Sequence, residues 1–258
     1  MSNYFIELTT VNIILTVLSA IAGAAMFVGC VAILNKVPAT WLCDYDEQPS
    51  EELLNGIRYK GNFTYITGCV LTAISTALTY LIFGATLYTV LVFILLFAML
   101  LIILADGKYY IIPDQFAVFA GVASLAFAYY DLFNRQITIT SWWSPLVGGV
   151  GVALLIVLVN LITMVIAKKQ GMGFGDVKLF LAVGIATGFP KVLIALLIAV
   201  FVSFIIILVT LIKNVVTKKE TENYIPFGPS ICIGVLACII LNAPIADAIN
   251  LYLSLFII

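Results

Sequence analysis

The sequence contains no histidine among its 258 residues. This absence excludes nucleophilic catalysis by a Ser-His or Cys-His pair, because the general base is missing. It also excludes a metalloprotease of the HExxH type, because the metal ligands are missing. Any proton transfer by this chain therefore depends on carboxylates, lysines, cysteines or tyrosines.

Cysteine pairs with metal-binding spacing are also absent. None of the five cysteines forms a CxxC pair with another, so a thiolate zinc site has no support, and we expect neither a metal nor a cofactor. Four of them lie in apolar stretches, where cysteine packs as a small hydrophobic residue. These four are Cys30, Cys69, Cys232 and Cys238.

Charged residues are scarce. They make up 10% of the chain, against roughly 25% in a soluble globular protein, whereas hydrophobic residues make up 64%. The mean hydropathy is +1.20. So little polar surface cannot cover the chain in water, and we expect a lipid bilayer around it. The near balance of 12 basic and 13 acidic residues provides no field that would recruit nucleic acid.

Long apolar runs predict membrane-spanning helices. Residues 91–105 lack the alternation of apolar and polar residues that a lipid-facing β-barrel requires. A helix of about 20 apolar residues spans a bilayer. We therefore predict an all-α, polytopic helical membrane protein with about eight transmembrane segments in a single integral membrane domain, 1–258. The candidate segments are 10–34, 63–83, 86–105, 112–131, 144–167, 176–189, 191–212 and 226–256.

The segment 176–189 differs from the others. It is short, it contains Gly184 and Gly188, and Pro190 follows it. We expect that it does not cross the full hydrocarbon thickness alone. Irregular backbone at membrane depth is tolerated where it lines a cavity, so this segment is predicted to form part of the wall of a site.

Basic residues are distributed unequally between the two sides of the predicted bundle. Cytoplasmic loops of membrane proteins carry the excess of lysine and arginine. Only Arg135 and Lys191 fall on one side. Ten fall on the other, which we predict to be cytoplasmic: Lys36, Arg58, Lys60, Lys108, Lys168, Lys169, Lys178, Lys213, Lys218 and Lys219. Both chain termini are then outside the cytoplasm.

Three carboxylates abut long apolar runs on the predicted cytoplasmic side. Asp106 and Asp114 belong to the run ADGKYYIIPDQF, and Asp176 belongs to GMGFGDVK. An ionisable side chain at membrane depth is costly and by default indicates function. The structural alternative for Asp176 is that it caps the helix that follows.

Glycines precede Asp176 at alternate positions, including Gly173 and Gly175. A glycine has no side chain to block an approaching chain and adopts backbone angles closed to other residues. The pattern therefore suits a site where a substrate backbone comes close, although a tight turn would use the same residues.

Asp106 and Asp176 together indicate acid–base chemistry. Two carboxylates held close together cannot easily both ionise, so one remains ionised as a general base and the other remains protonated. The ionised member can deprotonate a water that attacks a peptide carbonyl, while the protonated member polarises that carbonyl. This chemistry requires neither histidine nor metal.

The combination of DGKYYIIPD, starting at Asp106, with GFGD at 173–176 resembles the type IV prepilin peptidases, which are bacterial polytopic aspartic proteases of the GxGD group. The likeness extends to 27–38, 57–68 and 225–234. It implies that Asp106 and Asp176 are the catalytic pair.

The resemblance gives other residues supporting roles. Asp114 corresponds to a frequent acid that is not usually catalytic. Gly173 and Gly175 belong to the second motif, and Lys178 follows it. The lysine either holds a nearby charge or extends its side chain to the membrane interface.

The implied substrate is a prepilin or pseudopilin with a basic leader, cleaved at the cytoplasmic face of the bacterial cytoplasmic membrane. Five acids in the loop 35–62 are then expected to attract that leader, although an ordinary solvated loop would look the same. They are Asp44, Asp46, Glu47, Glu51 and Glu52.

The N-terminal part departs from the family pattern. Residues 1–85 resemble the family's methyltransferase-associated region, but the first loop keeps Cys43 alone instead of paired CxxC motifs. The usual RYPxxE element also loses its proline and its glutamate after Tyr59. We expect an intact aspartic peptidase core at 86–258, and we place N-methylation of the pilin in doubt.

Two other classes of membrane protein are compatible with intramembrane acids. A transporter or channel would bind a cation with acids near the middle of its spans, often with inverted repeats, and neither feature is visible. A presenilin-like protease shares the GxGD element but pairs it with YD and PAL motifs, whereas this chain has IPFGPS at 225–230.

Overall fold

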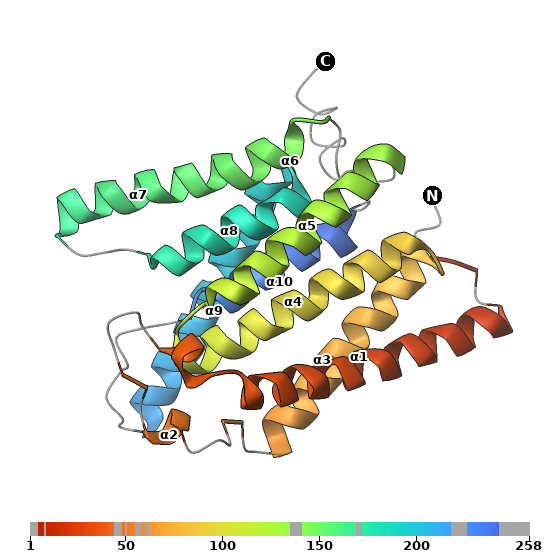
Figure 1. Cartoon of the computed structure of the whole chain (residues 1–258), viewed down its shortest axis with the longest axis horizontal. Helices are drawn as coiled ribbons and strands as arrows, with labels where there is room; N and C mark the ends of the chain where they lie inside the picture. The colour runs from red at the N-terminus through yellow and green to blue at the C-terminus, as the bar shows by residue number, and fades with distance from the viewer. Residues whose placement is uncertain are drawn as a thin grey trace. The chain divides into compact units, whose positions relative to one another are not determined.

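The computed structural model covers the whole chain (Figure 1). The residues that it describes are 5–7, 9–43, 48–49, 51–54, 58–59, 62–134, 141–168, 172–217 and 226–242. These residues form helices and contain no strand. The predicted all-α, polytopic architecture is therefore confirmed.

Six helices of the described residues are long and apolar enough to cross a membrane. These stretches are Thr10–Lys36, Tyr65–Phe83, Leu87–Tyr109, Asp114–Asn134, Ser144–Ile166 and Lys191–Ile212. Each corresponds to one of the eight predicted segments.

The other two predicted segments contain shorter helices. Helix α8 (Phe174–Thr187) has 14 residues and α10 (Gly228–Ile240) has 13. At 1.5 Å per residue, each is roughly 20 Å long, which is less than the hydrocarbon thickness of about 30 Å. The short length of α8 agrees with the expectation for 176–189, while residues 243–256 of the last segment lie outside the described residues.

The chain divides into two compact units. Unit 1 comprises Met1–Leu101 with Ile240–Ile258, and unit 2 comprises Ile102–Ile239. Helix α4 (Leu87–Tyr109) therefore contributes its last turns to unit 2. The functional division into 1–85 and 86–258 stays a prediction.

In unit 1, α1 (Thr10–Lys36) and α3 (Asn62–Phe83) pack against each other, as Figure 1 shows. A Cβ on Gly23 of α1 would lie 2.7 Å from the carbonyl oxygen of Thr72 on α3. The hydroxyl of Thr76 donates a hydrogen bond to the Ser19 carbonyl at 2.8 Å. Small and hydroxylated residues thus allow the two helices to approach closely, as is common within membranes.

The loop after α1 contains η1 (Ala39–Leu42) and the short α2 (Glu51–Leu54). Arg58 is buried and donates from Nη1 to the carbonyl of Leu34 at 2.7 Å. The Asn35 side chain accepts hydrogen bonds from the backbone N–H groups of Arg58 and Tyr59. These bonds fix the end of the loop to the end of α1.

Most of the predicted acidic cluster lies outside the described residues. Asp44, Asp46 and Glu47 are not described, and neither is the side chain of Glu52. Glu51 is exposed at the start of α2. The expectation that these acids attract a basic leader therefore stays a prediction.

Unit 2 is organised around α8. This helix packs against α5, α7 and the π-helical turn η2, and Figure 1 shows α7 and α8 side by side. In addition to α8 and α10, unit 2 contains α5 (Asp114–Asn134), α6 (Ser144–Leu146), η2 (Val147–Gly151), α7 (Val152–Ala167) and α9 (Lys191–Thr217). A Cβ on Gly148 would lie 2.6 Å from the carbonyl oxygen of Gly184, so glycines permit the contact between η2 and α8.

One buried carboxylate of unit 2 was not predicted. Asp131 is fully buried in α5 and interacts electrostatically with Lys191, the first residue of α9. The predicted segment 112–131 ends at Asp131, and the sequence analysis did not single out this acid. A buried charge needs a partner of opposite sign, and Lys191, 60 positions later in the chain, provides it.

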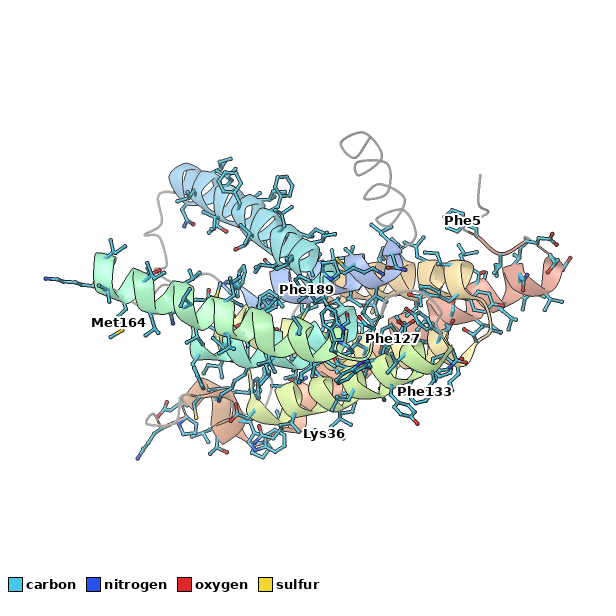
Figure 2. The ribbon with its side chains drawn as sticks, turned by 90° about the horizontal axis from the view of Figure 1, so that it is seen from above. Phe5, Lys36, Phe127, Phe133, Met164 and Phe189 are labelled. Atoms are coloured by element: carbon cyan, nitrogen blue, oxygen red, sulfur yellow. The ribbon has the colours of Figure 1, made fainter. Side chains whose placement is uncertain are left out.

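The apolar side chains of several helices point outward. On α7, Met164, Val165 and Ile166 are exposed, and Figure 2 shows the side chain of Met164 projecting from the ribbon. Large exposed apolar surfaces are unusual in soluble proteins. They are expected where a helix meets lipid, and they agree with the membrane-spanning assignment of α7.

Candidate active site

Asp106 lies in the last turn of α4, and its residue is only 5% exposed. Tyr110, the residue after the helix, has a left-handed φ of 58°, and its N–H donates to the Asp106 carbonyl at 2.9 Å. Such a left-handed residue ends a helix and redirects the chain. The end of α4 thus leads into α5 and leaves the Asp106 carboxyl in the interior of unit 2.

The N-terminal end of α10 meets Asp106. The backbone N–H of Gly228 donates to Oδ2 of Asp106 at 2.8 Å. The ring of Phe227, just before α10, lies 6.5 Å from the ring of Phe180 on α8, measured between centroids. This segment belongs to the family resemblance at 225–234, but no local pattern in the sequence distinguishes Gly228.

Asp176 is the third residue of α8, in its first turn. The N-cap of this helix is Gly173, with φ −68° and ψ 150°, so the alternative that Asp176 is the N-cap residue is wrong. The Asp176 N–H donates to the Gly173 carbonyl at 3.2 Å. A negative charge in the first turn interacts favourably with the helix dipole.

The two predicted glycines precede Asp176 and do not adopt unusual backbone angles. Neither Gly173 nor Gly175 has a positive φ. A Cβ on Gly173 would lie 3.6 Å from Oδ2 of Asp176, and one on Gly175 would lie 3.4 Å from Cβ of Ile112. Gly173 therefore leaves space next to the Asp176 carboxyl group, Gly175 packs close to Ile112, and the predicted conformational role of the two glycines is not seen.

The structure brings Asp106 and Asp176 within electrostatic reach of each other. Burial, and then the charge of Asp106, raise the pKa of Asp176 above that of an ordinary aspartate, while a hydrogen bond from the backbone of Gly173 opposes this rise. Two acids in this relationship can share one proton. The arrangement is suited to chemistry that needs a general acid and a general base together.

Asp114 and Lys178 form an ion pair beside this site. Nζ of Lys178 donates to Oδ1 of Asp114 at 2.8 Å, and both side chains are partly exposed. The ammonium group also lies 5.1 Å from the centroid of the Phe174 ring. The contact agrees with the alternative in which Lys178 holds a nearby charge.

Among the described residues, no three or more His, Cys, Asp and Glu side chains are arranged as a group that could hold a metal ion. The five cysteines are free thiols, and Cys30, Cys232 and Cys238 are buried. The expectation that the chain uses no metal and no cofactor stays a prediction.

Comparison with protein families gives one match. Residues 93–208 match the model of the type IV leader peptidase family, and this region contains both Asp106 and Asp176. The searches of curated proteins and of solved structures gave no match. Residues 93–208 of this membrane protein are therefore similar to the type IV leader peptidase family, in agreement with the resemblance seen in the sequence.

Proposed function

We propose that this protein is a membrane aspartic endopeptidase that removes the leader peptide from type IV prepilins or pseudopilins. The observation that carries the proposal is the electrostatic interaction between Asp106 and Asp176, which both lie inside the region that matches the leader peptidase family. The same match favours a peptidase over a transporter or channel, and a leader peptidase over a presenilin-like protease.

The reaction follows from two carboxyl groups that share a proton. The ionised carboxylate removes a proton from a water molecule, whose oxygen attacks the scissile carbonyl carbon. The protonated carboxyl donates its proton to the carbonyl oxygen as negative charge develops there. Collapse of the tetrahedral intermediate then breaks the C–N bond, and the amine leaves with a proton from the first carboxyl group.

The surroundings of Asp176 suit an extended peptide. Gly173 is exposed and extended, and it has no side chain next to the Asp176 carboxyl group. We infer that the backbone of the prepilin passes over these glycines on its way to the aspartates. The five acids of the loop 35–62 would attract the basic leader before it enters the site.

We place the enzyme in the bacterial cytoplasmic membrane, with its active site facing the cytoplasm. The excess of basic residues in the loops on one side supports this orientation. The loops that flank Asp106 and Asp176 belong to that side in the predicted topology.

Co-expression with candidate prepilins tests the function. The wild-type enzyme should yield a mature pilin whose N-terminus, determined by mass spectrometry, starts after the leader. Replacement of either aspartate, Asp106→Asn or Asp176→Asn, should leave the prepilin uncut. Asp114→Asn is the matched control, because it removes a third carboxylate near the same loop while sparing the pair. Cleavage by Asp106→Asn at the wild-type rate would refute the assignment.

A further inference from the structure

The start of α10 faces the carboxyl group of Asp106. Gly228, the first residue of this helix, donates its backbone N–H to Oδ2 of Asp106 at 2.8 Å, and the bond is buried. Cys232, one turn later on the same side of α10, interacts electrostatically with Asp106. Two successive turns of α10 thus lie beside this carboxyl group.

The contact requires glycine at position 228. A Cβ there would lie 2.7 Å from Oδ2 and 3.1 Å from Cγ of Asp106, which is too close for non-bonded atoms. The next residue, Pro229, has no N–H to donate. The Gly228 N–H is one of the first amides of α10, which have no partner within the helix, and Asp106 accepts its hydrogen bond.

This donor favours the ionised form of Asp106. A backbone N–H at the start of a helix interacts most strongly with a negative charge, because the helix dipole adds to the hydrogen bond. Gly228 is buried, so water does not compete for its N–H. The backbone of Gly173 likewise forms a hydrogen bond with Asp176 that favours its ionised form. Gly173 is exposed, however, so solvent weakens this hydrogen bond.

None of the other titratable groups described near Asp106 opposes its ionised form more strongly than the Gly228 N–H favours it. Asp176 of α8 is the acid that shares its site, and Cys232 of α10 is fully buried, where a thiol stays protonated. Asp114 of α5 is paired with Lys178. On α4 itself, Lys108 is exposed and lies 5.2 Å from the centroid of the Tyr109 ring.

We propose that the backbone N–H of Gly228 holds Asp106 as the ionised member of the pair, so that Asp106 is the general base and Asp176 carries the shared proton. This assignment rests on the proposed function and adds the order of proton transfers to it. Asp106 takes the proton of the attacking water, and Asp176 gives its proton to the carbonyl oxygen. Asp106 then passes its proton to the leaving nitrogen, and the proton of a hydroxyl of the intermediate returns to Asp176. Gly228 is a positioning residue, because it acts through Asp106.

The pH dependence of kcat/KM for prepilin cleavage tests the assignment. The acidic limb reports the first proton lost by the pair, and the alkaline limb reports the second. The Gly228→Ala variant displaces the carboxylate from its donor. A second variant, in which an ester replaces the Gly228 amide, removes the N–H without adding a Cβ and so preserves the packing.

Both variants should move the acidic limb to higher pH by about one unit or more, since a hydrogen bond to a charged group is lost. The alkaline limb should stay in place. Gly234→Ala is the matched control, because its Cβ would meet the carbonyl oxygen of Ala195 and crowd the same helix without touching a carboxylate. It should lower thermal stability and move neither limb.

Two outcomes would overturn the assignment. Movement of the alkaline limb instead of the acidic one would show that Asp106 carries the proton and Asp176 is the base. No movement of either limb in the ester variant would show that the Gly228 N–H does not control the pair.

Infrared titration of the enzyme without substrate separates this inference from the proposed function. The C=O stretch of protonated carboxyl groups is followed against pH, and the spectrum of Asp106→Asn is subtracted to isolate the signal of Asp106. In the Gly228 variants, the pH at which this signal disappears should rise by the same amount as the acidic limb of kcat/KM. A wild-type enzyme that titrates in this way but leaves prepilins uncut would refute the proposed function and retain the role of Gly228.

Discussion

Nζ of Lys178 lies 2.8 Å from Oδ1 of Asp114, and this ion pair joins α8 to the first residue of α5. Asp176 is only two residues before Lys178, so the pair holds the end of α8 that carries Asp176 against α5. The side chains are 31% and 42% exposed. Because solvent screens an exposed pair, it contributes only about 0–1 kcal/mol.

We predict that Asp114→Asn retains substantial activity, with kcat/KM reduced less than about tenfold, since the lost interaction is weak. Lys178→Met should cause a similar reduction. The double variant should be no worse than either single one, because both remove the same contact. Steady-state cleavage of a purified prepilin measures all three. If Asp114→Asn were inactive while Asp106→Asn cleaved normally, the catalytic pair would have to be reassigned to Asp114 and Asp176.

The proposed catalytic pair predicts strong non-additivity. Asn keeps the volume of Asp but cannot share the proton, so Asp106→Asn and Asp176→Asn should each lower kcat at least about 1000-fold while substrate still binds. The double variant should be little worse than either, because the two carboxyl groups act as one unit. Single-turnover cleavage and a separate binding measurement check this. If the reduction of kcat in the double variant equalled the product of the two single reductions, the two aspartates would act independently.

The sequence predicted those features that depend on the residues of a single segment. The apolar runs predicted the helices, because membrane insertion depends on the composition of each segment. The motifs around Asp106 and Asp176 predicted a shared site, because two acids at the ends of apolar runs are costly without a function.

Features that depend on distant partners could not be predicted. Gly228 and Asp106 are separated by 122 positions, and nothing in the local sequence shows that an amide of α10 meets the carboxyl group. The burial of Asp131 likewise depends on Lys191 from another helix. The capping of α8 was missed for a different reason, since it depends on the extended backbone of Gly173, three residues before Asp176.

The raised pKa of Asp176 predicts a pH-dependent stability. Burial and the Asp106 charge keep a proton on the folded enzyme at pH values where the unfolded chain has lost it. The free energy of unfolding should therefore fall as pH rises from the ordinary aspartate range through the raised pKa of Asp176. Thermal unfolding in detergent should show this decline in the wild type and much less of it in Asp176→Asn. Asp114→Asn should keep the wild-type slope, and equal slopes in wild type and Asp176→Asn would contradict the prediction.

The absence of CxxC pairs from the first loop predicts that the enzyme cleaves prepilins but does not methylate the mature pilin. Cys43 is a free thiol whose Sγ lies 3.6 Å from the Thr40 carbonyl oxygen, and no CxxC pair accompanies it in the sequence. Purified enzyme, prepilin and S-adenosylmethionine should give a mature pilin without the mass of an added methyl group. Chelators should leave cleavage unchanged. A bifunctional member of the family is the positive control, and stoichiometric methylation by this enzyme would refute the prediction.

The unequal distribution of basic residues predicts the orientation of the chain in the membrane. Ten of the 12 lysines and arginines lie on one predicted side, so 35–62 and 168–175 should face the cytoplasm and 132–143 the exterior. Single cysteines at Glu51→Cys and Ser141→Cys test this in a background where Cys43 and Cys69, the two thiols that are not buried, are replaced by serine. An impermeant maleimide should label Ser141→Cys in intact cells and Glu51→Cys only after permeabilisation. Glu51 is exposed, so failure to label it in intact cells reflects its side of the membrane and not burial. The reverse pattern would place the acidic loop and the active-site loops outside, where a cytoplasmic leader could not reach them before export.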